Sequence, residues 1–241
     1  MYDICVIGAG PAGISSAVYA ASRGLKTIVL EQKKVGGLLG SVSTVTHYAG
    51  ILADETGESF SLRLKEQAER AGIEIAMEKV VEADLSGAVK RIVAEGTTYE
   101  AKAVIIAAGT TPRKLGIPGE DTFAGRGTGL NPAKDAKKYE GREAFVVGGA
   151  DGAVKEALFL SKFASKVTII HFEDTLGAIP EFTEKVKRTA NMEVRLHSRL
   201  SRIEGEGQAD RIVIEDEHTK EQEWICLLYT SPSPRDPKTY R

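Results

Sequence analysis

The chain has 241 residues, of which 42% are hydrophobic and 27% charged. This composition lies near the average of globular proteins, so it excludes a disordered or low-complexity chain, and the length indicates one large domain or two small ones. The 32 basic and 34 acidic side chains leave a formal net charge of −2. Because a phosphate backbone selects a basic surface, nucleic acid is not an expected partner.

The N-terminus and the cysteine count narrow the class further. No apolar run approaches the roughly 20 residues that cross a membrane, and Asp3 stands where a signal peptide carries basic residues. We therefore expect a cytoplasmic protein without a membrane partner. Cys5 and Cys226 are too few for a disulfide framework or a zinc site. The histidines show no pair at metal-ligand spacing, so no metal is expected: His47, His171, His197 and His218.

The first 31 residues predict a β-turn-α-β unit that binds a dinucleotide. An apolar strand over 2–8 and a helix to about Arg23 flank the turn Gly8-Ala9-Gly10-Pro11-Ala12-Gly13, and a second strand follows over 26–31. In this G-x-G-x-x-G pattern, the first glycine permits the tight turn, the second lets a pyrophosphate approach and the third allows close helix–strand packing. Glu31, 18 residues after Gly13, is expected to accept from a ribose hydroxyl. The alternative is a glycine-rich turn without a ligand.

The same unit recurs 140 residues later, where 145–153 precede a helix to about Phe163 and a strand over 166–171. The aligned pairs are Gly8 with Gly148, Gly13 with Ala153 and Glu31 with His171. Ala150 replaces Gly10, and its methyl group would push the backbone away from a pyrophosphate. This unit is therefore either a second dinucleotide site or a half kept for structure alone.

The region between the units predicts a helix over about 56–71 and short strands around 73–77, 79–83, 88–93 and 97–102. We interpret these strands as an antiparallel β-meander, followed by a separate strand Ala103–Ala107 and the turn 108–113. The Pro and Gly residues of 115–120 are typical of a crossing between domains. The predicted fold is α/β with two three-layer Rossmann-like domains, 1–112 and 113–225.

The last residues differ in composition from the rest. From Cys226 to Asp236 the chain matches the in-frame translation of a transposase-type sequencing adapter. We interpret 226–241 as a foreign tail, which means that the natural chain continues differently after Ile225. The alternative is a disordered C-terminal tail.

Over 1–225 the chain resembles the low-molecular-weight thioredoxin reductase flavoproteins. The motifs that carry the resemblance are 6–13, Glu31 with Gly36-Gly37-Leu38, 104–109 with Thr111-Pro112-Arg113, 116–120 and 157–164. The resemblance implies a homodimer and an FAD domain, begun by 1–112, that is interrupted by the NAD(P)-binding domain 113–225. The FAD domain is then incomplete in this chain. Expected FAD contacts are Gly8, Gly10, Pro11, Ala12, Gly13, Glu31, Gly36, Gly37, Leu38, His47, Ala108 and Gly109. Expected pyridine-nucleotide contacts are Gly148, Asp151, Gly152, Ala153, His171 and Glu173.

The chain departs from this family at the redox site. Where the family has Cys-x-x-Cys-Asp, this chain has Asn131-Pro132-Ala133-Lys134-Asp135. Thiol–disulfide exchange needs a thiolate, and Cys5 is expected to be buried in the first strand, so dithiol chemistry is not expected. Asp135 is one catalytic candidate, and the alternative is that it only begins a helix. His47 beside the flavin is the other candidate, and the alternative is that it is an exposed loop histidine. Lys134 is either a cation near flavin N1 or a solvated surface lysine.

A second departure concerns the nucleotide. The family motif His-Arg-Arg-x-x-x-Arg, which holds the NADPH 2′-phosphate, becomes residues 171–177 with Phe172, Glu173 and Gly177 in place of the arginines. A carboxylate repels a phosphate and suits a free 2′-hydroxyl, so NADH is expected rather than NADPH. The alternative is a solvated acidic turn.

These observations predict a flavin-dependent NAD(P)H oxidoreductase without a dithiol. Its acceptor is expected to be a small molecule or a redox protein, although the incomplete chain can be inactive by itself. One alternative is an enzyme that resembles the ferredoxin/flavodoxin–NAD(P) reductases, which are built on this scaffold. The missing arginines count against this alternative. Another is a flavin- or nucleotide-binding module without turnover.

Overall fold

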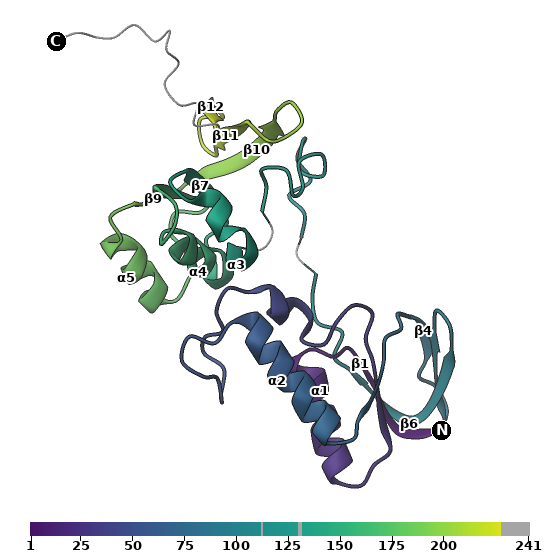
Figure 1. Ribbon diagram of the computed structural model, residues 1–241. Helices are drawn as coiled ribbons and strands as arrows, with labels where there is room; N and C mark the ends of the chain where they lie inside the picture. The colour runs from purple at the N-terminus through teal and green to yellow at the C-terminus, as the bar shows by residue number, and fades with distance from the viewer. Residues whose placement is uncertain (112, 130–131, 228–241) are drawn as a thin grey trace, which may run out of the picture. The chain divides into compact units, whose positions relative to one another are not determined.

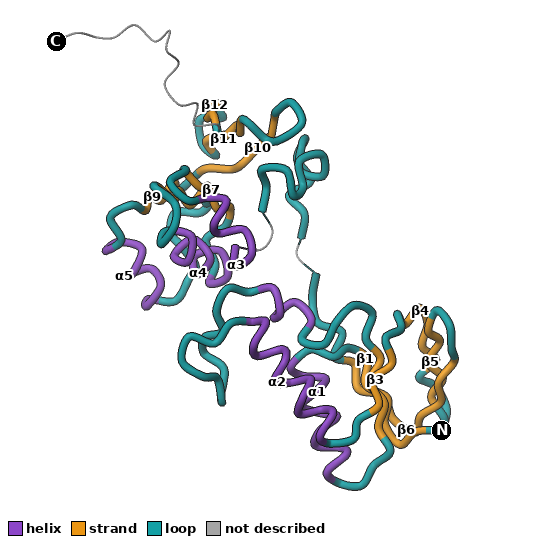
Figure 2. The backbone as a smooth tube through the Cα atoms, in the orientation of Figure 1, coloured by secondary structure: helices purple, strands orange, loops and turns teal. Residues whose placement is uncertain are grey.

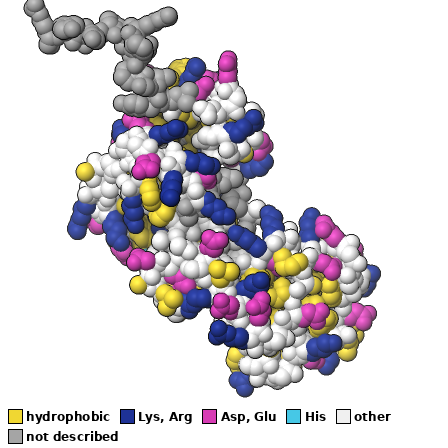
Figure 3. All heavy atoms as spheres, in the orientation of Figure 1, with side chains coloured by type: hydrophobic (Ala, Val, Ile, Leu, Met, Phe, Trp, Pro, Cys, Tyr) yellow, Lys and Arg dark blue, Asp and Glu magenta, His cyan; other side chains and the backbone are white. Residues whose placement is uncertain are grey.

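The computed structural model describes residues 1–111, 113–129 and 132–227. They belong to two compact units, unit 1 (Met1–Pro112) and unit 2 (Arg113–Arg241), which are described separately below (Figure 1). In the described parts of the chain, no helix is both long and apolar enough to cross a membrane. Basic and acidic side chains are interspersed on the face shown in Figure 3.

Unit 1 contains a six-stranded sheet in the order β3-β2-β1-β6-β5-β4. The first four strands in this order are parallel, and β4, β5 and β6 form antiparallel pairs. The strands are β1 (Tyr2–Ile7), β2 (Thr27–Leu30), β3 (Glu74–Ala76), β4 (Val80–Asp84), β5 (Lys90–Ala94) and β6 (Thr98–Ile106).

Helices cover one face of this sheet. They are α1 (Pro11–Ser22) and α2 (Gly57–Arg70), with the short 3-10 helix η1 (Gly37–Ser41) before α2. Thr56 begins α2 with a capping box, in which it and Ser59 satisfy each other's backbone amides. Val6 and Val29 pack against these helices, whereas the opposite sheet face packs against the β4–β5 hairpin around Ile92. Unit 1 therefore has three layers.

Two strand predictions for unit 1 were wrong. The run 73–77 is not part of the meander, because β3 pairs in parallel with β2 after the chain crosses back along α2. The predicted strands 97–102 and Ala103–Ala107 are one strand, β6, which pairs with β5 through its first part and with β1 through its last part. A single strand thus joins the meander to the parallel sheet.

Unit 2 repeats the β-turn-α-β arrangement and adds a second sheet (Figure 2). Its parallel sheet has β7 (Glu143–Val147), β8 (Lys166–Ile170) and β9 (Met192–Arg195), and its antiparallel sheet has β10 (Ser198–Glu204), β11 (Arg211–Asp216) and β12 (Gln222–Cys226). The helices are α3 (Pro132–Asp135), α4 (Asp151–Leu160) and α5 (Pro180–Arg188), with the 3-10 helix η2 (Ala136–Tyr139) after α3.

The two faces of the parallel sheet in unit 2 have different partners. Val167 and Ile169 pack with α4 and α5 around Phe182, and Phe145 and Ile170 pack with the antiparallel sheet. Unit 2 therefore also has three layers, and the predicted α/β fold class is confirmed. The antiparallel sheet itself was not predicted.

Several predicted features lie at the edge of the described residues. Cys226, the first residue of the predicted foreign tail, pairs with Arg211 at the end of β12, whereas 228–241 lie outside the described residues. The predicted crossing segment contacts β10, since the Ile203 amide donates to the Pro118 carbonyl at 3.0 Å. Pro112 and Asn131 lie outside the described residues.

Candidate functional site

The turn between β1 and α1 leaves no room for side chains at two of its glycines. Gly8 has a φ of +102°, and a Cβ atom there would lie 2.3 Å from the Ala107 carbonyl oxygen. A Cβ atom at Gly13 would lie 1.9 Å from the Gly8 carbonyl oxygen. The first and third glycines therefore permit close backbone contacts with β6 and within the turn.

Gly10 differs from both, because a Cβ atom there would meet no atom within 4 Å. It is the N-cap of α1, with φ −72° and no side-chain cap, and Pro11 opens the helix. Amide groups at a helix N-terminus without a cap attract anions. The backbone at Gly37 approaches this place, since a Cβ there would lie 3.8 Å from the Gly10 Cα.

Glu31 is 7% exposed and lies directly after β2. Its Oε2 accepts from the Ala9 amide at 2.8 Å, and its Oε1 accepts from the Lys33 amide at 2.9 Å. The carboxylate is thus held against the glycine turn by backbone donors. Each oxygen keeps a lone pair that can accept from a ribose hydroxyl.

The other predicted FAD contacts of unit 1 come from distant parts of the sequence. The Gly36 amide donates to the Ala9 carbonyl at 2.8 Å, which brings 36–38 to the turn, and the Leu38 side chain is 51% exposed. Ala108 follows β6, and its Cα would lie 3.2 Å from a Cβ at Gly8. Gly109 has a φ of +66° and open space around it.

His47 is an exposed residue with a left-handed φ of 57°. The next residues, Tyr48 to Gly50, line an open cavity of about 440 Å³ together with side chains of α2, but His47 does not line it. Arg63 of α2 holds the loop through the buried Glu55, with its Nη1 2.7 Å from both carboxylate oxygens. The flavin contact of His47 stays a prediction.

The turn of unit 2 has nearly the same backbone conformation as the turn of unit 1, but the residue before its helix carries a side chain. Ala150 is the N-cap of α4, and its φ of −84° and ψ of 170° are close to the −72° and −179° of Gly10. Gly148 has a φ of +123° and its Cβ would lie 3.1 Å from the Ala153 Cβ. The methyl group of Ala150 therefore takes the place that is open beside Gly10.

Asp151 and Gly152 begin α4. The Asp151 Oδ1 accepts from the Ile179 amide at 2.8 Å, which connects the start of α4 to the start of α5. A Cβ at Gly152 would meet no atom within 4 Å. Asp151, a predicted nucleotide contact, thus joins the starts of two helices.

His171 and Glu173 lie together after β8. His171 is 6% exposed, and its Nε2 is 3.2 Å from the Glu173 Oε2. Its ring packs against the turn, because a Cβ at Gly149 would lie within 2.6 Å of three ring atoms. Phe172 between them is 43% exposed and carries the Arg199 guanidinium 4.1 Å from its ring centroid.

The sequence shows no pair of histidines at metal-ligand spacing, but the fold brings two of them together. His197 Nδ1 lies 3.0 Å from His218 Nε2 and 3.3 Å from the Asp174 Oδ1. The fold brings the turn at His197 and the β11–β12 turn together, so two histidines that are 21 positions apart in the sequence are in contact. Among the residues that the structure describes, no group of three or more His, Cys, Asp or Glu is arranged to hold a metal ion.

The redox-site candidates of the predicted family motif lie on α3. Lys134 is exposed, and Asp135 is half-buried with its Oδ1 2.6 Å from the Lys138 Nζ. This hydrogen bond raises the pKa of Lys138. Cys5 is fully buried in β1, so its predicted burial is confirmed. A catalytic role for Asp135 stays a prediction.

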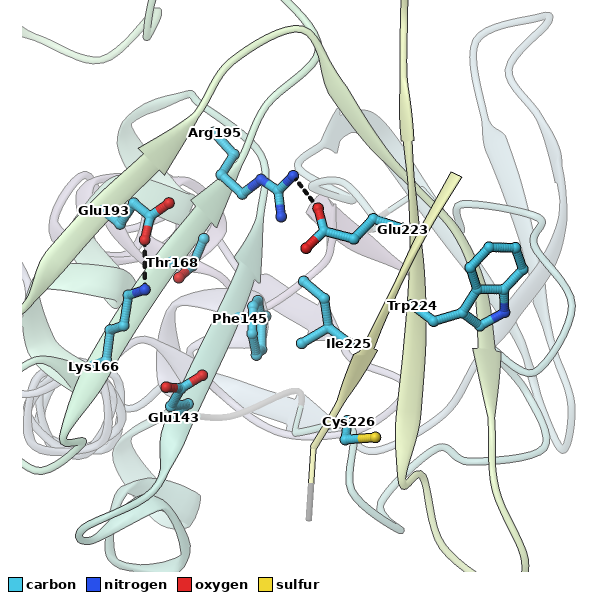
Figure 4. A pocket seen from close by; sticks show the side chains of 10 residues that line it. All are labelled: Glu143, Phe145, Lys166, Thr168, Glu193, Arg195, Glu223, Trp224, Ile225 and Cys226. Carbon is cyan, nitrogen blue, oxygen red and sulfur yellow. Dashed lines mark hydrogen bonds and ion pairs between the residues drawn. The ribbon is translucent and has the colours of Figure 1, made fainter. Parts of the chain in front are cut away.

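A further cavity of about 380 Å³ lies in unit 2 between the parallel sheet and β12 (Figure 4). Four of its charged side chains form ion pairs with one another, Lys166 with Glu193 and Arg195 with Glu223, each at 2.5 Å. None of the predicted site residues lines it. The fifth charged side chain of the lining, Glu143, takes part in neither pair, so the lining carries one carboxylate more than it has cations.

Two glycine turns of this kind, each between a parallel strand and a helix, define a class of α/β proteins with a repeated dinucleotide-binding fold. Among solved structures, the chain is similar to Lactococcus lactis thioredoxin reductase in its FR conformation, with a TM-score of 0.89 and 31% identity over 94% of this chain and 75% of that one. It is also similar to T. acidophilum thioredoxin reductase, with a TM-score of 0.86, 27% identity and coverage of 93% and 74%.

Sequence comparison places the chain in a family. It is 41% identical over 216 residues to the thioredoxin reductase of Peptoclostridium acidaminophilum, covering 90% of this chain and 69% of that protein. The Peptoclostridium litorale thioredoxin reductase is 38% identical over 221 residues, with coverage of 92% and 70%. The family model for pyridine nucleotide-disulphide oxidoreductases matches residues 2–230. The chain belongs to this family, which confirms the resemblance and the predicted class, a flavin-dependent NAD(P)H oxidoreductase.

Proposed function

We propose that the chain is an FAD-dependent oxidoreductase that takes electrons from NADH and passes them directly to an acceptor, without dithiol chemistry. The observation that carries this proposal is the lack of a cysteine pair. Cys5 lies in β1 of unit 1 and Cys226 at the end of β12 in unit 2. Burial raises the pKa of Cys5 to about 11, so its thiol stays protonated at neutral pH and does not attack disulfides.

The turn of unit 1 fits FAD. The space beside Gly10 and the uncapped start of α1 at Pro11 and Ala12 suit a pyrophosphate, and Glu31 suits the ribose. The segments 36–38 and 108–109 border the same turn. When bound, the flavin supplies the hydride and electron chemistry, and these residues bind and orient it.

Unit 2 supports NADH over NADPH. Gly148, Gly152 and Ala153 form the turn that would face the nucleotide pyrophosphate, and Glu173 places a negative charge in the loop after β8. The nearby Arg199 does not replace the missing arginines, because it is paired with Glu217 and stacked on Phe172. A 2′-phosphate would meet a carboxylate here instead of a cluster of cations.

Stopped-flow flavin reduction of the FAD-loaded protein tests this nucleotide preference. We expect NADH to be at least about tenfold more efficient than NADPH, which requires only about 1.4 kcal/mol. The double variant Phe172→Arg/Glu173→Arg should narrow or reverse the ratio, because it releases Arg199 from its ring and adds two cations. Faster reduction of the wild type by NADPH would contradict the proposal.

Disulfide reduction tests the missing dithiol. Neither oxidised thioredoxin nor a small aromatic disulfide should turn over through a protein thiol. Turnover that disappears in Cys5→Ser would show that the buried thiol reacts, whereas turnover that survives this change would come from the flavin.

A second candidate is a flavin- or nucleotide-binding module without turnover. It is favoured by the methyl group of Ala150 at the start of α4 and by the carboxylate of Asp151 beside it. Anaerobic mixing with NADH separates the two candidates, because only an oxidoreductase bleaches the flavin band. For the oxidoreductase, we propose a small molecule or redox protein as acceptor and a homodimer as the assembly.

A further inference from the structure

The residue that matches Glu31 in unit 2 is held rigidly. The His171 amide donates to the Arg195 carbonyl, and the His171 carbonyl accepts from the Ser198 amide, each at 2.9 Å. The ring lies against Gly149, where a Cβ would approach it within 2.6 Å. Both the backbone and the ring of His171 are therefore fixed by packing, independently of any ligand.

This packing determines which ring nitrogen of His171 has a hydrogen-bond partner. Its Nε2 faces the Glu173 carboxylate at 3.2 Å, and its Nδ1 is buried without a hydrogen-bond partner. A proton on Nδ1 would be a buried donor without an acceptor, which is unfavourable, whereas a proton on Nε2 is accepted by the carboxylate. The ring nitrogen whose proton finds an acceptor is therefore Nε2, which donates to Glu173.

Glu173 combines this fixed partner with access to solvent. Its side chain is 57% exposed, and only Oε2 takes part in a side-chain hydrogen bond within the described residues. The second oxygen, Oε1, is left with lone pairs for a ligand.

We propose that His171 is the positioning residue that holds Glu173 to accept a hydrogen bond from the free 2′-hydroxyl of an adenosine nucleotide in unit 2. This inference rests on the nucleotide site of the proposed function. Glu173 takes the role that Glu31 has in unit 1, two residues later in the chain. The same position disfavours a 2′-phosphate, since the Glu173 carboxylate repels it.

Calorimetric binding of ADP-ribose and 2′-phospho-ADP-ribose to the FAD-loaded protein tests this role without turnover. We expect ADP-ribose to bind at least about tenfold more tightly. His171→Leu removes the Nε2–H donor and should reduce this ratio about fivefold, whereas His171→Gln keeps an N–H donor and should restore most of it. Glu173→Gln removes the charge and should also reduce the ratio.

Asp174→Asn is the matched control, because Asp174 is the next acidic residue of the loop and lies 3.3 Å from His197 instead. It should leave the ratio unchanged. Long-range ¹H–¹⁵N NMR of the protein without nucleotide should show a proton on Nε2 of His171, assigned by the loss of this signal in His171→Gln. This spectrum and the Glu173 and Asp174 variants decide the question even if His171→Leu does not fold.

The outcomes separate the inference from the proposed function. If the wild type binds neither nucleotide, the nucleotide site itself is wrong, and the inference with it. If the wild type prefers ADP-ribose but Glu173→Gln keeps the ratio, or the NMR spectrum shows a proton on Nδ1 of His171, the inference alone is overturned.

Discussion

The two β-turn-α-β units have similar turn backbones but differ in the side chains at the predicted ligand contacts. In unit 1, Gly10 leaves open space at the start of α1, and Glu31 is tied to the turn by the Ala9 amide. In unit 2, Ala150 has nearly the same φ and ψ, and His171 covers Gly149. Two side-chain exchanges therefore change the space at the start of the helix and beside the turn, while the backbone of the turn stays nearly the same.

The units also differ in how the antiparallel strands join the parallel sheet. In unit 1, β6 pairs with both β5 and β1. In unit 2, β12 pairs with β11 alone among the described strands. The end of β6 thus packs against the turn of unit 1, since Ala107 contacts Gly8. Because of this contact, we expect the turn of unit 1 to tolerate added side-chain atoms less well than the turn of unit 2.

The substitution with the largest expected effect is at Gly13, the third glycine of the turn in unit 1. Gly13→Ala should lower the free energy of unfolding of unit 1 by about 3 kcal/mol and abolish flavin binding, because the new Cβ would lie 1.9 Å from the Gly8 carbonyl oxygen. The control Gly152→Ala meets no atom within 4 Å and should be neutral. Urea unfolding and flavin content measure both. A stable, yellow Gly13→Ala protein would contradict the tight packing.

The next largest effect is expected when Glu31, which follows β2, is replaced by histidine, the residue type that follows β8 in unit 2. Glu31→His removes the acceptors of the Ala9 and Lys33 amides, so stability should fall by about 2 kcal/mol and flavin affinity at least about tenfold. Glu100→Gln, an exposed carboxylate on β6, is the control. Unchanged flavin affinity in Glu31→His, measured by fluorescence titration, would show that Glu31 does not contact the cofactor.

A smaller effect is expected at the second turn position, on affinity rather than stability. Gly10→Ala should weaken flavin binding about tenfold while the free energy of unfolding changes by less than about 1 kcal/mol, since no atom of the protein blocks the new methyl group. Ala150→Gly should strengthen nucleotide binding in unit 2 by a similar factor. If neither affinity moves, the two helix starts are not the phosphate sites.

The smallest effect concerns Cys5, whose pKa burial raises from 9.0 to about 11. Between these values the thiol ionises in the unfolded chain and stays protonated in the folded one, so its contribution to stability is present below pH 9.0 and is lost as the pH rises towards 11. At pH 9.5 this loss is less than about 1 kcal/mol.

Comparing wild type with Cys5→Ala over this pH range isolates the contribution of that thiol. Native protein should also expose only Cys226 to a thiol reagent, because Cys5 is fully buried. Fast labelling of Cys5 at neutral pH would contradict its packing in β1.

The sequence by itself determined both β-turn-α-β units of this protein. The glycine turn at Gly8, its repeat at Gly148 and the apolar strands beside them are local patterns, because a left-handed φ and a buried strand depend on neighbouring residues. The α/β class and the missing cysteine pair could be read in the same way. The sites of ligand contact follow from these motifs as predictions, since the motif places them at fixed distances along the chain.

Only the tertiary structure decided which strands pair and which polar side chains meet. The run 73–77 has no local feature that separates a parallel edge strand from a meander strand, and its pairing with β2 follows from the path of α2. The pairs of Asp151 with Ile179 and of His197 with His218 join residues 28 and 21 positions apart. Such contacts depend on where the chain returns in space, and the buried Nδ1 of His171 is visible only once its neighbours are in place.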